Sequence, residues 1–181
     1  MYRLMLALLA VSTTLGVSVG TGHASSSLRD ALVERFGLSR IEVQNASGEG
    51  RVIAKGTLLE LRADGIPANT LRFVQINTKS PRFHVADYAR VAVGTDGRLT
   101  ANPGALSLTK GTRLAVLGLK VEQDRVRVFT HTLDPVRLTD GTSAYGCTEF
   151  VFAFDPATLN RADVAAVAGR IAEWLSVGSP S

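Results

Sequence analysis

The clearest pattern of apolar and polar residues runs from Lys110 to Leu133, KGTRLAVLGLKVEQDRVRVFTHTL, and predicts a long β-hairpin. Residues 114–121 are apolar at almost every position, which is typical of a central strand covered on both faces. After a polar turn at 122–124, apolar and polar residues alternate along residues 125–130, which is typical of a half-exposed strand. We therefore expect a buried first strand and a second strand with one face in solvent.

The second strand of this hairpin would carry a basic stripe that contains one aromatic ring. Because side chains alternate between the two faces of a strand, Arg125, Arg127, Phe129 and His131 share one face. Arginine is common on exposed strands, so the stripe fits an ordinary solvated face with Phe129 folded over a sheet edge. It also fits a binding face for an anionic partner. These four residues, called the basic stripe below, are our candidate binding site.

Other strands and turns can be predicted around the hairpin. Residues 149–154, EFVFAF, are apolar on both faces and place three phenylalanines on one of them, which predicts a central, well-buried strand. Residues 95–97, Thr-Asp-Gly, are typical of a tight hairpin turn. Lys-Gly-Thr occurs at 55–57 and again at 110–112, each time before an apolar strand. We expect each Gly-Thr to make the same turn into its strand.

Helical spacing of apolar residues occurs near both ends of the chain. A capping-box pattern starts at Ser27 and Gly37 is placed to end a helix, so we expect an N-terminal helix over residues 25–38. Near the other end, Asn160 is expected to cap an amphipathic helix over residues 160–176. The apolar stripe of this second helix must pack on an apolar surface, for which the sheet is the obvious candidate.

Residues 1–24 have the form of a secretory signal peptide. Arg3 is basic, residues 4–19 are mostly apolar, and Gly22-His23-Ala24 fits a small-x-small cleavage site. Cleavage would leave a mature chain that starts near Ser25, exported to the periplasm or secreted. Polar residues interrupt the apolar stretch and make an uncleaved membrane anchor the weaker interpretation. We expect no stable membrane span after cleavage.

Composition narrows the class of partner. The chain has 181 residues, 45% of them hydrophobic, which is enough for one core. Its formal net charge of +4 falls to +3 when the leader is removed, because Arg3 is the only charged residue there. This balance does not indicate a nucleic-acid partner. The single cysteine, Cys147, cannot form an internal disulfide.

Candidate chemistry centres on Cys147. A thiol hydrolase needs a thiolate beside an imidazole that a third polar group orients, and His84 or His131 with Asp87 or Asp134 provide the residue types. No signature of a known cysteine enzyme surrounds Cys147, so the interpretation as a small buried apolar residue is stronger. The histidines and the cysteine lack the close spacing of metal ligands. We expect no metal and no cofactor.

These patterns together predict an α+β fold. We expect a strongly bent antiparallel sheet or small β-barrel of about six to eight strands, with one helix at each end of the mature chain. The expected organisation is a signal peptide at 1–24, a helix at 25–38, one β-rich domain at 39–176 that includes the C-terminal helix, and a disordered tail at 177–181.

A family resemblance rests on the order of these features. The Lys55-Gly56-Thr57 strand, the Thr95-Asp96-Gly97 turn, the Lys110-Gly111-Thr112 hairpin, the strand that contains Phe150 and the C-terminal helix follow one another. This order resembles exported bacterial proteins of unknown function in which a small SH3-like barrel or curled sheet is closed by helices. The resemblance covers about residues 51–175. It implies the fold class and brings no catalytic residues with it.

Two hypotheses about function follow. The favoured one is a non-enzymatic, exported binding or interaction module that uses the basic stripe to bind an envelope protein or an anionic ligand. The alternative is a hydrolase of the cell envelope that uses Cys147 as nucleophile and His131 as base.

Overall fold

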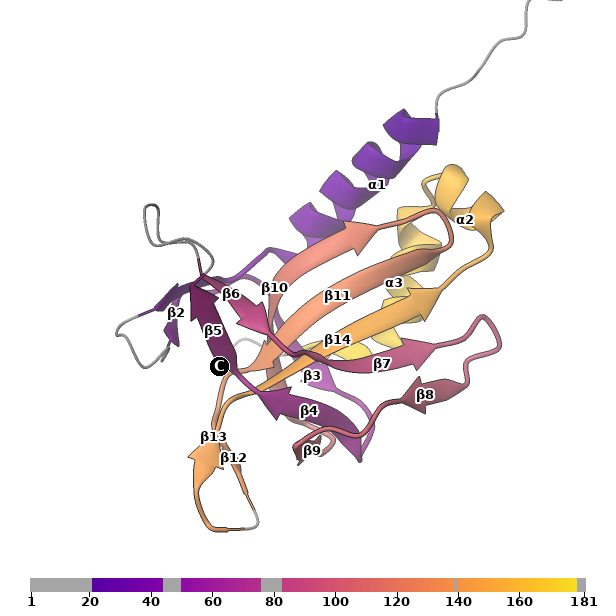
Figure 1. Cartoon of the computed structure of the whole chain (residues 1–181). Coiled ribbons are helices and arrows are strands. Elements are labelled where there is room, and N and C mark those ends of the chain that lie inside the picture. Colours follow the sequence, from indigo (N-terminus) through magenta and orange to yellow (C-terminus); the bar gives the residue numbers. More distant parts are fainter. Residues whose placement is uncertain (1–20, 44–49, 76–82, 139, 179–181) are drawn as a thin grey trace, which may run out of the picture.

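The hairpin predicted between Lys110 and Leu133 lies at the centre of the sheet in the computed structural model (Figure 1). The structure describes residues 21–43, 50–75, 83–138 and 140–178. The two hairpin strands pair antiparallel, and a bulge at Leu117 in the first strand keeps Leu119 on the same buried face as Val116. Each hairpin strand also pairs with another strand at its other edge, so both are internal to the sheet. The order across the sheet is β15 (Leu175–Val177), β3 (Leu58–Leu61), β10 (Arg113–Val121), β11 (Arg125–Thr132), β14 (Gly146–Ala153), β4 (Ile66–Thr70) and β9 (Leu106–Leu108).

These seven strands curl strongly into a half-barrel, which confirms the predicted α+β class and bent sheet (Figure 1). Two more strands extend the sheet beside the C-terminal part of β14: β7 (Ala89–Val93) and β8 (Leu99–Ala101). They form the predicted hairpin around Thr95-Asp96-Gly97, with Gly97 at a φ of 83° that favours glycine. The pairing of β7 with β14 is parallel, in contrast to the antiparallel sheet expected from the sequence.

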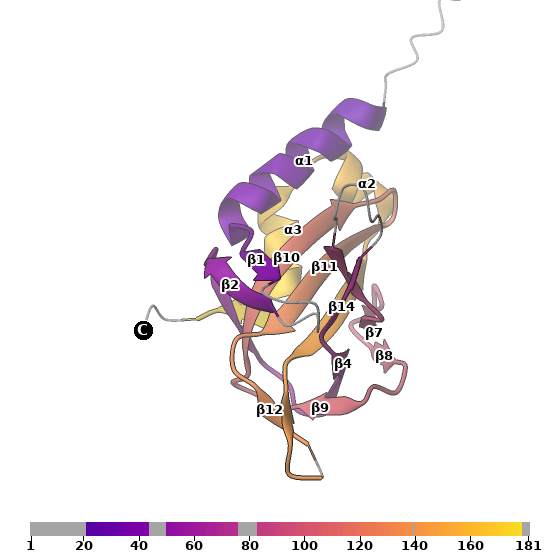
Figure 2. The same cartoon turned by 60° about the vertical axis from the view of Figure 1, so that its left-hand side comes forward.

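Three short hairpins flank the main sheet. They are β1 (Arg40–Val43) with β2 (Gly50–Ala54), β5 (Arg72–Gln75) with β6 (Phe83–Ala86), and β12 (Val136–Arg137) with β13 (Ser143–Ala144). The last of these projects from one end of the sheet in both views (Figures 1 and 2).

The helices lie on one side of the sheet and close the core (Figure 2). They are α1 (Thr21–Phe36), α2 (Pro156–Asn160) and α3 (Val164–Ala172). Helical spacing brings Leu28, Leu32 and Phe36 of α1 onto the sheet, and period-two spacing turns Phe150 and Phe152 of β14 to meet the helices. All five side chains are at most 2% exposed. The core therefore lies between this inner face of the sheet and the helices.

The first helix ends as predicted and begins earlier. Gly37 follows the last turn at a φ of 46°, and its amide donates to Val33 O. The helix starts at Thr21 instead of at the capping box, so Ser27 and Asp30 lie inside it, and the Asp30 carboxylate pairs with Arg29 Nη1 at 3.1 Å. Residues 1–20 of the predicted signal peptide lie outside the described residues.

The predicted C-terminal helix is confirmed within narrower bounds, Val164–Ala172 instead of residues 160–176, and its predicted cap is wrong. Asp155 caps a short helix that ends at Asn160, and Ala162 at a φ of 52° separates it from α3. Asp163 caps α3, because its side chain accepts a hydrogen bond from the Ala166 amide at 3.0 Å. Asn160, our predicted cap, is therefore the last residue of a helix and not the first of one.

The residues after α3 form an edge strand instead of a further helical turn. Leu175 is fully buried, and β15 pairs antiparallel with β3, so this strand covers an edge that would otherwise expose unpaired backbone groups. Val177, expected in a disordered tail, belongs to this strand, and the Gly178 amide donates to Leu58 O at 2.9 Å. Residues 179–181 of that tail lie outside the described residues.

The two Lys-Gly-Thr segments do not make the same turn, contrary to our expectation. Gly111 has a φ of 83° in a turn closed by the Thr112 amide and Thr109 O. Gly56 is needed for close approach: a Cβ there would lie 1.6 Å from Gly37 O. Each glycine is thus required for a different physical reason.

Candidate functional site

The basic stripe lies on the face of the sheet that is turned away from the helices, called the outer face below. Strand register places Arg125, Arg127, Phe129 and His131 of β11 opposite residues 153, 151, 149 and 147 of β14. On the other side of β14, Arg90 and Ala92 of β7 stand beside Glu149 and Val151. The outer face is thus built by three neighbouring strands that are far apart in the sequence.

The arginines of the stripe are held by carboxylates. Arg125 forms a two-pronged pair with Asp124, with Nε–Oδ1 and Nη2–Oδ2 distances of 2.7 Å. This contact lowers the pKa of the Asp124 carboxyl. Arg127 pairs with Glu149 and, through Nη1, with Glu122 at 3.0 Å. The stripe therefore carries paired charges of both signs instead of a bare positive surface.

Glu149 is the centre of this charge network. Its side chain is only 5% exposed, although it belongs to the outer face. Arg127 covers it from β11, and Arg90 Nε donates to Glu149 Oε2 at 3.0 Å from β7. Two guanidinium groups thus compensate one buried carboxylate and tie three strands together.

Phe129 does not fold over a sheet edge, because β11 is internal. Its ring lies over Gly118 of β10, where a Cβ would come 3.5 Å from the ring. Tyr88 packs edge-on against it with ring centroids 5.2 Å apart, and Lys120 Nζ and Arg127 Cζ lie 5.6 and 5.3 Å from its centroid. Phe129 is half-buried and acts as a platform for its charged neighbours.

His131 and Cys147 are brought together, as direct cross-strand partners of β11 and β14. His131 was expected to be half-exposed and is only 3% exposed, while Cys147 is fully buried. His131 Nδ1 contacts Thr132 O, and Nε2 has no hydrogen-bond partner in the part of the chain that the structure describes. Burial lowers the pKa of His131, which favours the neutral imidazole.

The Cys147 thiol is chemically quiet. Burial and the nearby Asp87 carboxylate raise its pKa to about 12, and Sγ donates to Asn69 O at 3.4 Å. Of the two aspartates proposed as a third group, Asp87 lies near Cys147, whereas Asp134 pairs with Arg113 at 2.8 Å. A nucleophilic cysteine needs a lowered pKa, because the thiolate is the reactive form. The surroundings of Cys147 raise its pKa and so disfavour the thiolate.

Neither a metal site nor a membrane-spanning helix is found among the described residues. No group of three or more His, Cys, Asp or Glu side chains there is placed to hold a metal ion. In the same ranges, no helix combines the length and the apolar character needed to span a bilayer.

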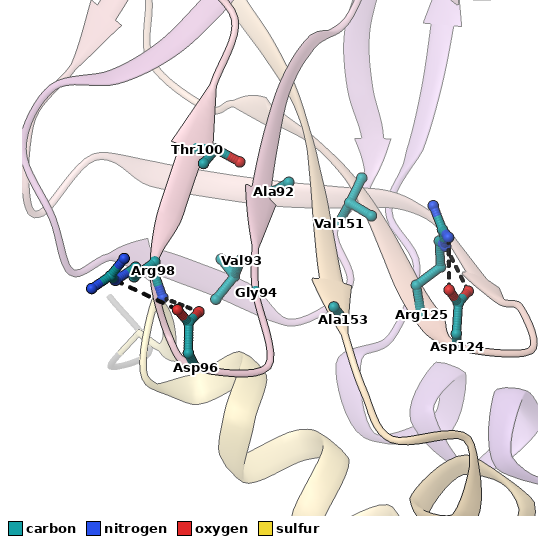
Figure 3. Close-up of a pocket in the computed structure, with 10 residues that line it drawn as sticks. All are labelled: Ala92, Val93, Gly94, Asp96, Arg98, Thr100, Asp124, Arg125, Val151 and Ala153. Carbon is teal, nitrogen blue, oxygen red and sulfur yellow. Dashed lines mark hydrogen bonds and ion pairs between the residues drawn. The ribbon is translucent and has the colours of Figure 1, made fainter.

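A half-open hollow of about 370 Å³ lies on the outer face, beside the arginine end of the stripe (Figure 3). Its floor is formed by Ala92, Val151 and Ala153, which are small and only partly buried. Strand register sets these three next to one another across β7 and β14. Their short side chains leave the surface recessed between the larger residues on either side.

Two Asp–Arg pairs flank the floor of the hollow on opposite sides (Figure 3). Asp96 and Arg98 come from the β7–β8 turn, Asp124 comes from the β10–β11 turn, and Arg125 is the first residue of β11. The first pair is loose, with Arg98 Nε 3.5 Å from Asp96 Oδ2 and side chains that are 88% and 60% exposed. Each side of the apolar floor thus carries one positive and one negative group.

The β7–β8 turn is anchored from behind by Arg170 of α3. Arg170 Nη2 donates to Gly94 O at 2.7 Å, and Nη1 pairs with Glu173 at 2.7 Å. The amide of Arg98 also donates to Asp96 Oδ1 at 3.0 Å. One rim of the hollow is therefore held by the helix layer below the sheet.

Sequence reasoning found one rim and missed the rest of the hollow. Arg125 was a predicted site residue, and the turn that contains Asp96 was predicted as a turn only. The floor was missed because Ala92 and Val151 become neighbours through the parallel pairing of β7 with β14, which leaves no local signal. In β14, the alternation of small residues with Phe150 and Phe152 was the one available hint.

Comparisons with known proteins found no relative of this chain. The chain matches no protein-family model, no curated protein and no solved structure.

Proposed function

We propose that the protein is a non-enzymatic binding module whose ligand binds on the outer face, in the hollow floored by Ala92, Val151 and Ala153. The hollow itself is the observation that carries this proposal. It combines an apolar floor that solvent reaches with charged groups of both signs at its rim. A recessed apolar surface with a few polar groups around it is the usual form of a ligand site.

The rest of the stripe supports the ligand site instead of forming it. Arg127 is engaged by Glu149 and Glu122, and His131 is buried. Their charges and contacts are used within the protein. Arg125 stands at the rim, so it is the stripe residue best placed to meet a ligand.

Binding is favoured over hydrolysis by the state of the thiol. The raised pKa of Cys147 and the lowered pKa of His131 disfavour a thiolate–imidazolium pair. Both side chains are also buried, away from the hollow's lining. The burial of both side chains and their shifted pKa values thus argue against the hydrolase alternative.

The proposed setting is the periplasm or the exterior of the cell. The signal-peptide pattern of residues 1–24 supports export, and so does the resemblance to exported bacterial proteins with an SH3-like barrel or curled sheet. A single cysteine that is buried and inert is compatible with an oxidising compartment. In this setting the partner would be an envelope protein or a small molecule.

The proposal is tested by filling the hollow. Ala92→Trp places a large ring on its floor without changing any charge, and Ser107→Trp on the exposed side of β9 is the matched control. Immobilised wild-type protein and both variants are incubated with an envelope extract of the source organism, and retained species are quantified by mass spectrometry. We expect at least one species to be retained by wild type and control and reduced about tenfold or more by Ala92→Trp.

Melting temperatures within a few degrees of one another show that both variants are folded. Equal retention of every species by all three proteins, or no species specific to wild type, would contradict a ligand site in the hollow.

A further inference from the structure

We infer that the partner is a protein that adds an extended segment to the free edge of β8, as a further antiparallel strand beside the hollow. This inference rests on the proposed function and names the class of partner. Among the described strands, β8 pairs only with β7, so its other edge is an outer edge of the sheet (Figure 1). Such an edge presents backbone donors and acceptors in the pattern that an extended peptide completes.

The backbone groups of Leu99 and Ala101 point away from β7. The Gly94 amide donates to Arg98 O at 2.9 Å, which makes these two residues a hydrogen-bonded pair. Antiparallel strands alternate between pairs that exchange hydrogen bonds and pairs that do not, so Arg98 and Thr100 face β7, whereas Leu99 and Ala101 face outward. No other described residue hydrogen-bonds to the amides or carbonyl oxygens of Leu99 and Ala101. These groups are therefore available to a partner.

The free edge is bounded on both sides. By the same alternation, the next residues whose backbone would face a partner are Gly97 and Pro103. The Gly97 amide already donates to Gly94 O at 3.0 Å, and proline has no amide hydrogen. An added strand therefore pairs with the 3 residues of β8. It exchanges about four hydrogen bonds with Leu99 and Ala101.

The other edges of the main sheet do not offer the same accessible groups. At β15, the Gly178 amide donates to Leu58 O, so Leu175 and Val177 face away from β3, but Leu175 is fully buried. At β9, Ser107 is exposed between two buried residues. In β8, by contrast, the last two residues are exposed and the first is only partly buried. An incoming strand thus finds its most accessible edge at β8.

The free edge lies beside the hollow. Thr100 lines the hollow and is the cross-strand neighbour of Ala92, which belongs to its floor (Figure 3). In an antiparallel addition, the residue opposite Thr100 places its side chain on the same outer face. A large apolar side chain there lies over Thr100 and reaches toward Ala92, because both of these side chains are short. Backbone bonds to β8 thus supply affinity, and the hollow selects the side chain.

The test follows amide hydrogen exchange and amide NMR shifts of the full protein. The probes are the peptides acetyl-Lys-Thr-X-Thr-Lys-amide, with Leu, Phe, Trp or Val at X. The proteins are wild type, Ala101→Pro, which removes an amide that faces away from β7, and Val177→Pro, which does the same at the β15 edge. In free wild type, the amides of Leu99 and Ala101 should exchange faster than that of Thr100. At least one peptide should slow exchange at both Leu99 and Ala101.

Methylation of single peptide nitrogens gives the decisive result. The amides of the two peptide threonines would donate to β8, whereas the amide of residue X would face away from it. N-Methylation of both threonines should weaken binding about tenfold or more, and N-methylation of X less than about twofold. Ala101→Pro should weaken binding of the unmethylated peptide about fivefold or more, and Val177→Pro should leave it unchanged. Melting temperatures within a few degrees of wild type show that both variants are folded.

Three results would overturn the inference. The first is unchanged exchange at Leu99 and Ala101 with every peptide, and the second is a loss from methylated X that equals or exceeds the loss from methylated threonines. The third is protection of these amides in the free protein that rises with protein concentration, which would mean that a second copy occupies the edge. None of them decides the proposed function, which the retention test on Ala92→Trp decides. Conversely, the expected methylation pattern upholds strand addition even if Ala92→Trp leaves retention unchanged.

Discussion

Glu149 is an acidic residue on the outer face of the sheet whose carboxylate is nevertheless buried. Its exposure of 5% is unusual for an acidic residue and is made possible by Arg90 and Arg127, whose side chains are 58% and 25% exposed. The two guanidinium groups remain in contact with water while they shield the carboxylate. The network therefore links β7, β14 and β11 without burying a positive charge completely.

Glu149→Gln should lower the free energy of unfolding by about 1–3 kcal/mol, because it removes two charge-assisted hydrogen bonds. The control Glu122→Gln, at a side chain that is 40% exposed, should lower it by less than about 1 kcal/mol. Urea denaturation of the three proteins measures both values. Equal effects of the two substitutions would contradict a central role of Glu149.

His131 should make stability depend on pH. Burial lowers its pKa in the folded protein below the ordinary value of 6.5, so the unfolded chain binds a proton more readily than the folded one. Stability is then complete above about pH 7.5 and falls as the pH drops through 6.5 toward the folded pKa. The melting temperature of wild type should decrease over this range, and His131→Asn should show a smaller decrease. Parallel curves would contradict this account.

Residue-level predictions succeeded where a side chain's position follows from strand period alone. The common face of Arg125, Arg127, Phe129 and His131 follows from alternation, and the cross-strand register of β11 with β14 bears it out. Exposure could not be predicted in the same way. Whether His131 is open or buried depends on what packs over it, and its ring contact with Tyr145 links residues from different hairpins.

At the scale of single elements, the two C-terminal helices are capped by Asp155 and Asp163, and not by the predicted cap Asn160. Asp155 and Asp163 each accept a hydrogen bond from an amide in the first turn of their helix. Pro156 then begins α2 in the position where a missing amide hydrogen costs nothing. Asn160 lies at the end of that helix, so its side chain has no cap to make.

Asp163→Ala should lower the free energy of unfolding by about 1 kcal/mol, because it leaves the first-turn amides of α3 without their acceptor. Asn160→Ala should change it by less than about 0.5 kcal/mol. Thermal and urea unfolding of the two single variants provide the comparison. A larger loss with Asn160→Ala would restore the longer helix that the sequence pattern suggested.

Strands could be predicted from the sequence where they pair with the next strand along the chain. The β10–β11 hairpin and the β7–β8 turn are both local, and both follow from alternation and turn residues. The β7–β14 and β3–β15 pairings join distant segments, and nothing in a short stretch encodes them. The floor of the hollow depends on the first of these pairings, which is why it was missed.

At the scale of the whole molecule, α1 belongs to the core. Leu32 is completely buried, and α1 contacts β10 as well as both C-terminal helices. The helix thus covers the inner face of the same strands whose outer face carries the stripe. If α1 were not part of the core, a substitution that destabilises α1 would leave the stability of the sheet unchanged.

Leu32→Ala should lower the free energy of unfolding of the entire domain by about 2–5 kcal/mol, because it leaves a cavity between α1 and the sheet. Unfolding followed by far-ultraviolet circular dichroism and by Trp174 fluorescence should shift together. Two separate transitions, with Trp174 unchanged, would show that α1 unfolds independently of the sheet.

The strand β15 has a consequence for how the protein acquires its fold. It supplies the edge partner of β3 across a sequence separation of 116 residues, seen in the contact of Ser176 Oγ with Glu60 O. β3 therefore cannot gain its second neighbour before the residues of β15 have been synthesised. Closing so long a loop is slow compared with forming a local hairpin. The complete sheet can therefore form only after the residues of β15 have been synthesised.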